Sequence, residues 1–590
     1  MTSFVFSRTG LTGRERILER TFEILPGLTS WTILLGMIVL GFLKPLVAAV
    51  FVIAIDFYWL LRLFYLTIFL ILSYLRLAIE RQTDWMQRVH HVDRPEASPI
   101  PLSGGTLPQR FSLAIHSREL SALRQSPSTP PVSDELYHLV IIPVVKEDAT
   151  IIEPGIQSLA QQTFPTKQIL VVLAVEERAQ LSVKEGARRL QQRYRQAFLD
   201  FLVVVHPDGL PGEAPVKGAN ATYAAKAADA YFDSRGITHD HVIASCFDAD
   251  TVVSPQYMAC LTYHFLITPD RTRASFQPIP VYHNNIWEAP GFARVLDIGA
   301  SFFQLIEATN PEKLVTFSSH SMSFKALVEV GYWPVDMISD DSAIFWKAFL
   351  YYHGRYRTVP MYVTVSMDVV AADAWWKTAM NVYRQKRRWA WGVENFPLVM
   401  RGFLQDAGIS LYDKIRLAFK LFEGHVGWAT WAFLLTIIGW IPAVFAGREF
   451  SSSVLYYSAP RITATIFHLA SVSLVTTIIL SLLFLPRPPV KRPLLKSVGL
   501  TLEWLLVPLA VTCFSALPAL DAQTRLMLGW PLDFWVTEKR RRPFDPSTQL
   551  RVESRAGVEG RRGTHQRPTV RSMVRHETPP RKPATIASGK

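Results

Sequence analysis

A chain of 590 residues is too long for a single compact core, so two or more folded units are expected. Almost half of the residues are apolar, and they gather toward both ends of the chain. The net charge of +13 comes mainly from residues 539–590, which hold fourteen Lys and Arg against four Asp and Glu. The rest of the chain is close to balanced, which argues against nucleic acid as a partner. A basic tail beside membrane segments is typical of attachment to anionic lipid.

The chain has three cysteines, Cys246, Cys260 and Cys513, and none of them belongs to a CxxC pair. This argues against a disulfide framework and against a thiolate zinc site. A catalytic thiol stays open as an alternative, but buried apolar cysteines are favoured.

The N-terminal part of the chain predicts a membrane hairpin. Residues 1–28 are rich in arginine and precede no small-residue cleavage site, so we expect a cytosolic segment and no removable signal peptide. Residues 29–78 are almost uninterruptedly apolar apart from a break at Lys44-Pro45, and each half can cross a membrane once. The charged Arg62 inside the second pass should face protein or the interface.

The middle of the chain predicts a soluble α/β domain. Residues 79–134 predict an interfacial helix and a Pro/Ser-rich linker. Across residues 135–395, β-branched runs alternate with amphipathic stretches, which predicts a mainly parallel sheet with ligands beyond the carboxyl ends of its strands. The predicted strands are 139–145, 168–175, 201–206 and 241–250, and the predicted helices include 184–200 and 219–233.

The chain then becomes apolar again. Residues 396–424 predict interfacial amphipathic helices, because 411–422 has one apolar face and one Lys/Arg face. Residues 425–520 predict a C-terminal transmembrane region, with full spans at 425–446 and 463–485.

The last apolar stretch conflicts with the distribution of charge. The basic loop at 487–496 is expected in the cytosol, and a full span at 498–520 would then place the basic tail outside. Because Pro508 and Pro518 interrupt this stretch, a re-entrant or broken segment is favoured. Residues 521–590 predict a cytosolic segment that ends in a disordered basic tail.

An acidic pair follows the predicted strand at 241–250. The carboxylates of Asp248 and Asp250, two residues apart at a strand end, can share a Mg²⁺ or Mn²⁺ ion that also binds a diphosphate. The alternative is a pair of solvated loop acids, and the spacing alone favours that alternative.

A second acidic pair, Asp340-Asp341, begins a helical pattern. Acids at this place commonly cap a helix and interact with its dipole. The functional alternative is a general base that takes a proton from an acceptor hydroxyl. Taken alone, the pair favours the capping role.

A third element is the basic and aromatic stretch at 383–392. The cluster of Lys386, Arg387 and Arg388 can neutralise a leaving pyrophosphate, and the neighbouring Trp389 offers a flat apolar face for a sugar ring. The alternative is a basic-aromatic belt beside a membrane, which is common.

These elements occur in one order between apolar segments. Together they resemble the membrane-integrated family 2 glycosyltransferases, such as cellulose, chitin and hyaluronan synthases, over about 135–395 and the flanking membrane arrangement. The family's pattern consists of an early Pro-x-x-x-Glu strand, an Asp-x-Asp, a Thr-Glu-Asp-like pair and Gln-x-x-Arg-Trp. The matching positions here are 143–147, 248–250, 339–341 and 385–389.

The resemblance implies a GT-A-type, Rossmann-like cytosolic domain inserted between α-helical transmembrane segments. It implies an inverting glycosyltransferase that transfers a sugar from a nucleotide-sugar donor, expected to be UDP-linked, with Asp341 as the catalytic base. Asp250 would coordinate Mg²⁺ or Mn²⁺, with Asp248 as a second ligand close to the nucleotide.

The resemblance also implies binding residues. Arg388 would meet the diphosphate, and Trp389 would stack on the acceptor sugar near Asp340. The other residues implied for the nucleotide-sugar are Pro143, Glu147, Glu176, Lys217 and Gln385, besides Asp248 and Asp250.

The chain departs from the family pattern in three places. Ser339 and Asp340 replace the Thr-Glu of the base element, and Glu177 could serve in place of Glu176. The segment 317–325 has serines and His320 where relatives place a small, glycine-containing acceptor loop, which leaves the acceptor open.

Three functions are therefore considered. The Gln-x-x-Arg-Trp element favours a processive synthase that extends a polysaccharide. A single transfer to a lipid acceptor is the alternative, and a non-enzymatic membrane scaffold is the third possibility. The partners expected are the nucleotide-sugar, a glycan or glycolipid acceptor and the lipid bilayer, in the plasma (inner) membrane with the catalytic domain in the cytosol.

Overall fold

The computed structural model describes residues 4–94, 106–125, 129–444, 454–488, 499–500 and 502–532. All of them belong to one compact unit, residues 1–542. The predicted tail at 539–590 and most of the predicted basic loop at 487–496 lie outside the described residues.

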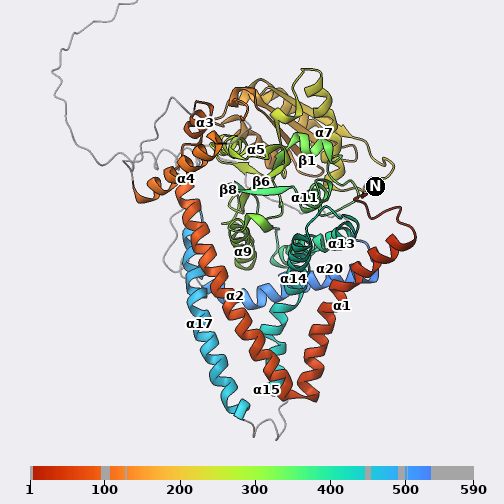
Figure 1. The fold of residues 1–590 in the computed structure, drawn as a ribbon, viewed down its shortest axis with the longest axis vertical. Coiled ribbons are helices and arrows are strands. Elements are labelled where there is room, and N and C mark those ends of the chain that lie inside the picture. Colours follow the sequence, from red (N-terminus) through yellow and green to blue (C-terminus); the bar gives the residue numbers. More distant parts are fainter. Residues whose placement is uncertain are drawn as a thin grey trace, which may run out of the picture. The chain divides into compact units, whose positions relative to one another are not determined.

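The central element is a mixed eight-stranded sheet with the strand order β3-β2-β1-β4-β7-β6-β8-β5 (Figure 1). β1 to β4 run parallel, as predicted for this half. β7 is antiparallel to both β4 and β6, and β5 is antiparallel to β8, so the sheet is mixed. The strands are β1 (Tyr137–Val144), β2 (Ile169–Glu176), β3 (Asp200–His206), β4 (Val242–Cys246), β5 (Val252–Val253), β6 (Ala274–Val281), β7 (Ser321–Ser323) and β8 (Arg357–Ser366).

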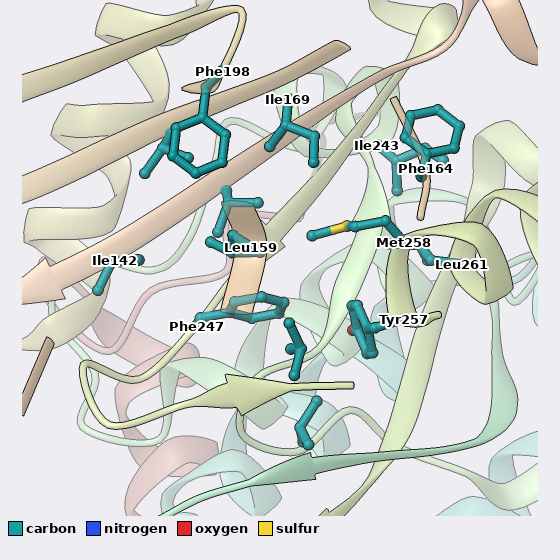
Figure 2. Packing of buried hydrophobic residues seen from close by; sticks show 14 of the residues in the cluster. Ile142, Leu159, Phe164, Ile169, Phe198, Ile243, Phe247, Tyr257, Met258 and Leu261 are labelled. Atoms are coloured by element: carbon teal, nitrogen blue, oxygen red, sulfur yellow. The ribbon is translucent and has the colours of Figure 1, made fainter. Parts of the chain in front are cut away.

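Helices cover both faces of this sheet, which explains why the early strands are apolar without interruption. Ile142 of β1 faces the core that α5, α6 and α8 close, and Figure 2 shows it with Phe247 and Met258. Leu139 and Ile141 face the opposite core, under α7, α11 and α13. The helices of this domain are α5 (Ala149–Ala160), α6 (Leu181–Tyr194), α7 (Lys217–Asp233), α8 (Tyr257–Ile267), α9 (Gly291–Glu307), α10 (Phe324–Glu329), α11 (Asp340–Tyr351), α12 (Trp375–Ala390) and α13 (Asn395–Gln405).

Apolar helices flank the α/β domain on both sides in the sequence. Among the described residues, α1 (Gly13–Leu43), α2 (Pro45–Glu80) and the segment Glu503–Leu528 are long and apolar enough to cross a membrane. The break between α1 and α2 falls at the predicted Lys44-Pro45. The predicted arrangement, an α/β domain inserted between apolar helices, is confirmed.

The first helix begins much earlier than the boundary expected near residue 29. Its first turns are polar, and they lie against the α/β domain, where Glu19 accepts a hydrogen bond from Arg401 Nε at 2.6 Å. The charges that argued for a separate segment in the sequence are therefore paired with residues far along the chain.

Two predicted elements after the domain merge into one helix. α14 (Leu411–Thr436) contains both the expected interfacial stretch at 411–422 and the start of the expected span at 425–446. Arg62 of α2 pairs with Glu423 of this helix, so it faces protein as expected. The short α15 (Ile441–Val444) comes after it, and further along the chain α17 (Val454–Phe484) lies beside α2 (Figure 1).

The predicted linker contains a helix. α4 (Leu107–Arg124) begins with a capping box between Thr106 and Gln109, and Pro108 stands in its first turn, where a proline is tolerated. Pro108, one of the prolines in the predicted linker, therefore lies in the first turn of a helix. The shorter α3 (Trp85–Asp93) precedes it.

The segment 503–528 is interrupted several times. A 3₁₀ turn at its start, α19 (Val507–Val511), a π-helical turn (Thr512–Ala516) and α20 (Leu517–Leu528) follow one another. In Figure 1 the last of these runs across α1 and α14, and it contacts both. A broken segment at 498–520 stays a prediction that these interruptions favour.

Candidate active site

The candidate site lies at the carboxyl edge of the parallel strands. Pro143 is the last but one residue of β1, and the Glu147 carboxylate in the following turn accepts hydrogen bonds from the backbone N–H groups of Val145 and Lys146, both at 3.0 Å. Glu176 is the last residue of β2. Because these strands are parallel, their ends share one edge, which also receives the start of α7.

Lys217, the first residue of α7, joins two of the predicted acids. Its Nζ lies 2.8 Å from Asp248 Oδ1 and 2.9 Å from Asp341 Oδ1. Burial alone would lower the pKa of Lys217, but the charges of Asp248 and Asp341 raise it well above its ordinary value, so the side chain is cationic. One lysine therefore brings together the end of β4, the start of α7 and the start of α11.

Asp248 is also held by the segment that was expected to differ from the family. Ser318 Oγ donates to its Oδ2 at 2.6 Å, and its own N–H donates to Ser319 Oγ at 3.3 Å. Ser319 has a φ of 58°, a left-handed conformation that favours glycine. A serine here keeps the backbone shape of a glycine turn and adds a hydroxyl that holds the acid, a conformation that costs energy and is found mainly at functional sites.

Asp250 is almost completely buried and points into the same region of the fold. Its Oδ2 accepts a hydrogen bond from the Asp368 N–H at 2.8 Å, and its carbonyl oxygen accepts one from Asn284 Nδ2 at 2.9 Å. The first contact holds the carboxylate and the second holds the backbone, with donors from the residues that follow β8 and β6.

The two acids fit the predicted Mg²⁺ or Mn²⁺ by their chemistry. Both offer carboxylate oxygens, which are the donors these ions prefer, and Mg²⁺ is commonly held by one or two carboxylates together with substrate phosphates. In the described part of the chain, the group of three metal-binding side chains whose donor atoms all lie within 4.8 Å is elsewhere, at Asp229, Asp233 and His239 near the far end of α7.

Asp340 is buried next to this cluster. Burial, followed by the charge of Asp341, raises the pKa of Asp340 to about 8, so the carboxyl is protonated at neutral pH. The charges of Lys217 and Arg388 act in the opposite direction and limit this rise in the pKa of Asp340.

This shift predicts how stability depends on pH. The folded state holds the Asp340 proton up to a pH of about 8 and the unfolded state releases it near 3.8, so the free energy of unfolding should fall between these values. Asp340→Asn stays neutral throughout. We expect the drop in Tm between about pH 6 and pH 9 to be roughly 2–4 °C smaller in this variant. An equal drop in both proteins, measured by thermal unfolding in detergent, would contradict a protonated Asp340.

A buried histidine lies beneath the predicted base. His320 Nδ1 is 3.7 Å from Asp341 Oδ1, and it also bonds to the Phe317 carbonyl oxygen at 3.1 Å. Burial lowers the pKa of His320, so the ring is neutral. The sequence marked this residue as a departure from the family but gave no sign of its contact with the base.

The three cations of the basic cluster on α12 have different surroundings in the structure. Lys386 is buried in an ion pair with Asp297 at 2.7 Å, and Arg387 pairs with Asp521 of α20 at 2.8 Å. Both cations are thus used within the protein, contrary to the expectation that they neutralise a pyrophosphate. Of the three, Arg388 is the one whose charge acts on Asp340 and Tyr282.

The buried pair predicts a stability effect. Lys386→Met leaves Asp297 buried without its partner, and we expect a loss of about 3–5 kcal/mol in the free energy of unfolding. The double variant Lys386→Met with Asp297→Asn should regain part of that loss. If Lys386 instead bound the leaving group, the single variant would weaken nucleoside diphosphate binding at unchanged Tm.

The aromatic element stands at the end of α12. The Trp389 ring contacts Phe317 and Tyr282, with ring centroids 5.8 and 6.1 Å away, and Lys386 Nζ lies 3.8 Å from its centroid. Gln385, one turn earlier, is buried. Trp389 is therefore fixed next to the segment that carries Ser318 and Ser319.

Glu147 and Glu176, the glutamates at the ends of β1 and β2, do not take part in the Lys217 ion pairs. Glu176 pairs with Arg178 in its own loop. It lines a cavity of about 180 Å³ together with His206, Asp208, Glu213 and Val216. The Glu177 carboxylate accepts from the Asp208 N–H at 3.1 Å, so it serves the same loop. Glu147 and Glu176 thus share the edge with the acids of β4 and α11 but not their ion pairs.

The comparisons with known proteins bear on this site. Residues 245–486 match the family model described as glycosyl transferase family group 2. The matched part contains the acids at 248, 250, 340 and 341 and the 385–389 element, and it begins after β1 to β3. The match supports a glycosyltransferase domain of family 2. A search of curated proteins finds no significant match.

Several solved structures show a loose likeness to this chain. A mannosyltransferase from Pyrobaculum calidifontis in complex with GDP-Man and Mn²⁺ is 15% identical, with a TM-score of 0.38 over 71% of this chain and 98% of that chain. TarS 1–349 of S. aureus in complex with UDP is 11% identical, with a TM-score of 0.33 over 57% and 88%. The same protein with UDP-GlcNAc is 12% identical, with a TM-score of 0.32 over 67% and 92%.

Proposed function

We propose that this chain is a membrane-bound, inverting glycosyltransferase that transfers a sugar from a nucleotide-sugar, UDP-linked, to a growing polysaccharide. The observation that carries the proposal is the double ion pair of Lys217 with Asp248 and Asp341. Acids from two distant parts of the sequence meet at the carboxyl edge of the sheet, where ligands of such folds bind. The family match over residues 245–486, which include Asp248 and Asp341, supports this assignment.

Asp341 is the base in the proposed reaction. Its carboxylate takes the proton of an acceptor hydroxyl, whose oxygen forms a bond to the anomeric carbon of the sugar. The bond from that carbon to the β-phosphate oxygen breaks in the same step, and the electron pair leaves with the nucleoside diphosphate. A single displacement inverts the configuration. Cationic Lys217 orients the base through its ion pair at 2.9 Å.

The leaving group needs positive charge. A bound Mg²⁺ or Mn²⁺ would be held by Asp250 and Asp248 and would neutralise the departing diphosphate. Arg388 of the 385–389 element would add a guanidinium, which suits a diphosphate because it can donate two hydrogen bonds at once.

The acceptor is proposed to approach past Trp389. Its ring, with those of Phe317 and Tyr282, forms an aromatic wall next to the base. α12, which carries Trp389, contacts α20, so this wall lies beside the segment that continues the apolar region. We propose that the domain stands on the cytosolic side of the plasma membrane, where nucleotide-sugars are made.

The test uses the purified full chain in lipid nanodiscs with a panel of UDP- and GDP-sugars, Mg²⁺ or Mn²⁺, and mass analysis of the product. A ladder of products differing by one sugar supports the processive synthase. A single addition to a lipid would replace it with the lipid-acceptor transferase. Absence of donor turnover across the panel would overturn the proposed function.

A further inference from the structure

A buried carboxylate lies behind the loop that carries the predicted base. Glu394 is 1% exposed and ends the 3₁₀ helix that follows α12. One of its oxygens, Oε1, accepts from Ile338 N at 3.0 Å, from Ser339 N at 2.9 Å and from Ser339 Oγ at 2.8 Å. The other oxygen accepts from Trp391 Nε1 and from Arg8 Nη1, both at 2.9 Å. One side chain thus joins the base loop to the start of the chain.

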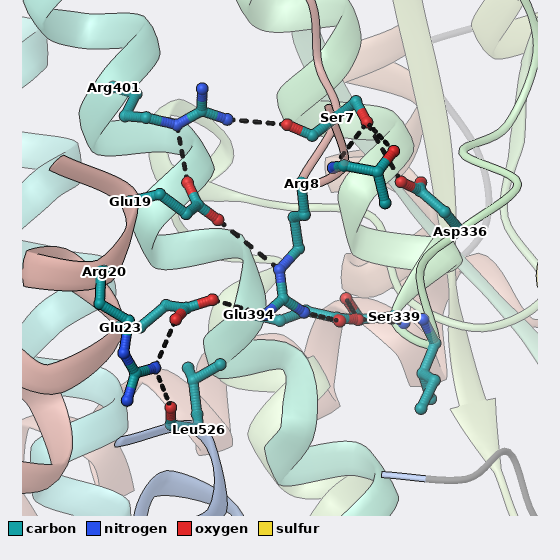
Figure 3. A network of polar contacts seen from close by, with 12 residues as sticks. Ser7, Arg8, Glu19, Arg20, Glu23, Asp336, Ser339, Glu394, Arg401 and Leu526 are labelled. Carbon is teal, nitrogen blue, oxygen red and sulfur yellow. Dashed lines mark hydrogen bonds and ion pairs between the residues drawn. The ribbon is translucent and has the colours of Figure 1, made fainter. Parts of the chain in front are cut away.

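The fifth partner belongs to an N-terminal arm, which we define as residues 4–23. Within it, Arg8 also pairs with Glu23 at 2.7 Å and lies 3.6 Å from Glu19, and Glu19 accepts from Arg401 of α13 at 2.6 Å (Figure 3). From Gly13 onward the arm is the first part of α1, the first candidate membrane helix. Ion pairs therefore run from a membrane helix to Glu394.

Glu394 controls the residue that precedes the two acids of α11. Ser339 stands at the N-cap position of this helix, but its side chain makes no capping hydrogen bond to the helix. The hydroxyl donates instead to Glu394 and accepts from Asn395 Nδ2 at 3.0 Å. Asp340 and Asp341 follow at once, so their place depends on the anchoring of Ser339.

We propose that Glu394 and Arg8 are positioning residues, which hold the loop before α11 so that Asp341 meets the acceptor hydroxyl. The assignment rests on the proposed function, in which Asp341 is the base. Glu394 touches neither the Lys217 ion pairs nor the 385–389 element directly, so it acts through Ser339 and Ile338. The N-terminal arm is thus part of the catalytic unit and more than a membrane anchor.

Two substitutions separate this role from general packing. Glu394→Gln keeps the size of the side chain, but its amide group has one accepting oxygen and can no longer receive donors on both sides. Arg8→Met removes the cation and leaves the carboxylate buried. We expect kcat to fall about 10- to 100-fold in both variants, with the donor KM within about twofold of wild type, because the base is misplaced by a fraction of an ångström. Arg8→Lys should restore part of kcat.

Matched controls come from ion pairs outside this network. Arg195→Met removes an exposed arginine that pairs with Asp200 at 3.1 Å. Arg193→Met removes an exposed pair with Glu153. Both controls should keep kcat and KM.

Hydrogen exchange gives a readout that needs no activity. We expect faster exchange of the peptide 336–343 in Glu394→Gln and Arg8→Met, and wild-type exchange in both controls. Unchanged exchange, or kcat and KM that fall together with Tm, would overturn the positioning role. If the wild-type protein turned over no donor, the proposed function would be wrong. The exchange result would still decide whether the arm holds the loop before α11.

Discussion

Asp341→Asn is expected to lower the rate of sugar transfer by about 10²- to 10⁴-fold, the usual range for loss of a general base. The amide has the size of the carboxylate but cannot take the proton from the hydroxyl of the acceptor. Lys217 keeps its ion pair with Asp248 at 2.8 Å, so the acid at the end of β4 stays in place. Donor binding should therefore change little. The measurement is the release of nucleoside diphosphate in steady state, beside calorimetric titration with UDP and GDP.

The control for this variant is Asp233→Asn, at the far end of α7, where the side chain is 70% exposed. It should have wild-type rates. Retained turnover in Asp341→Asn would remove Asp341 from the role of base.

Asp250→Ala is expected to abolish the metal dependence of donor binding. In wild type, Mn²⁺ should strengthen nucleoside diphosphate binding, because a divalent ion bridges carboxylate and phosphate oxygens. Without Asp250 we expect a loss of about tenfold or more in affinity when Mn²⁺ is present, and little change in the presence of EDTA.

A second variant distinguishes the loss of a metal ligand from a purely structural effect. Asp250 also accepts the Asp368 N–H at 2.8 Å, and alanine would leave that donor buried without a partner. Asp250→Asn retains an oxygen for it while losing the negative charge. If Asp250→Asn binds the nucleotide with Mn²⁺ as wild type does, the metal role of Asp250 is wrong.

Local sequence predicted the first half of the sheet well. β1 and β2 are apolar runs rich in β-branched residues, since both faces of each strand are buried, and β3 is a half-buried edge strand with a similar run. The predicted limits of all three lie within two residues of the observed ones. β6 and β8 were not predicted. Both contain proline, at 278, 280 and 360, which cannot donate to a sheet and argues against a strand. A register shift between Pro278 and Ile279 accommodates this part of β6.

Some residues of the candidate site could likewise be predicted from the sequence, and others could not. Asp248 and Asp250 are two residues apart, and Asp341 directly follows Asp340, so each acidic pair is visible in the sequence. The partners of Lys386 and Arg387 were not, because Asp297 and Asp521 lie far away along the chain. Identical charges in one cluster thus have different environments, which only the tertiary structure decides. The same holds for Glu394, whose partners come from three separate segments.

The arm has a further consequence for the biogenesis of this protein. Arg8 lies 386 residues before Glu394, and Glu19 lies 382 residues before Arg401. A ribosome makes the N-terminal part first, so α1 is synthesised long before either partner exists. Contacts of such large sequence separation form late in folding. Docking of the arm therefore follows synthesis of the catalytic domain, and a nascent chain that stops short of residue 394 lacks the distant partners Glu394 and Arg401.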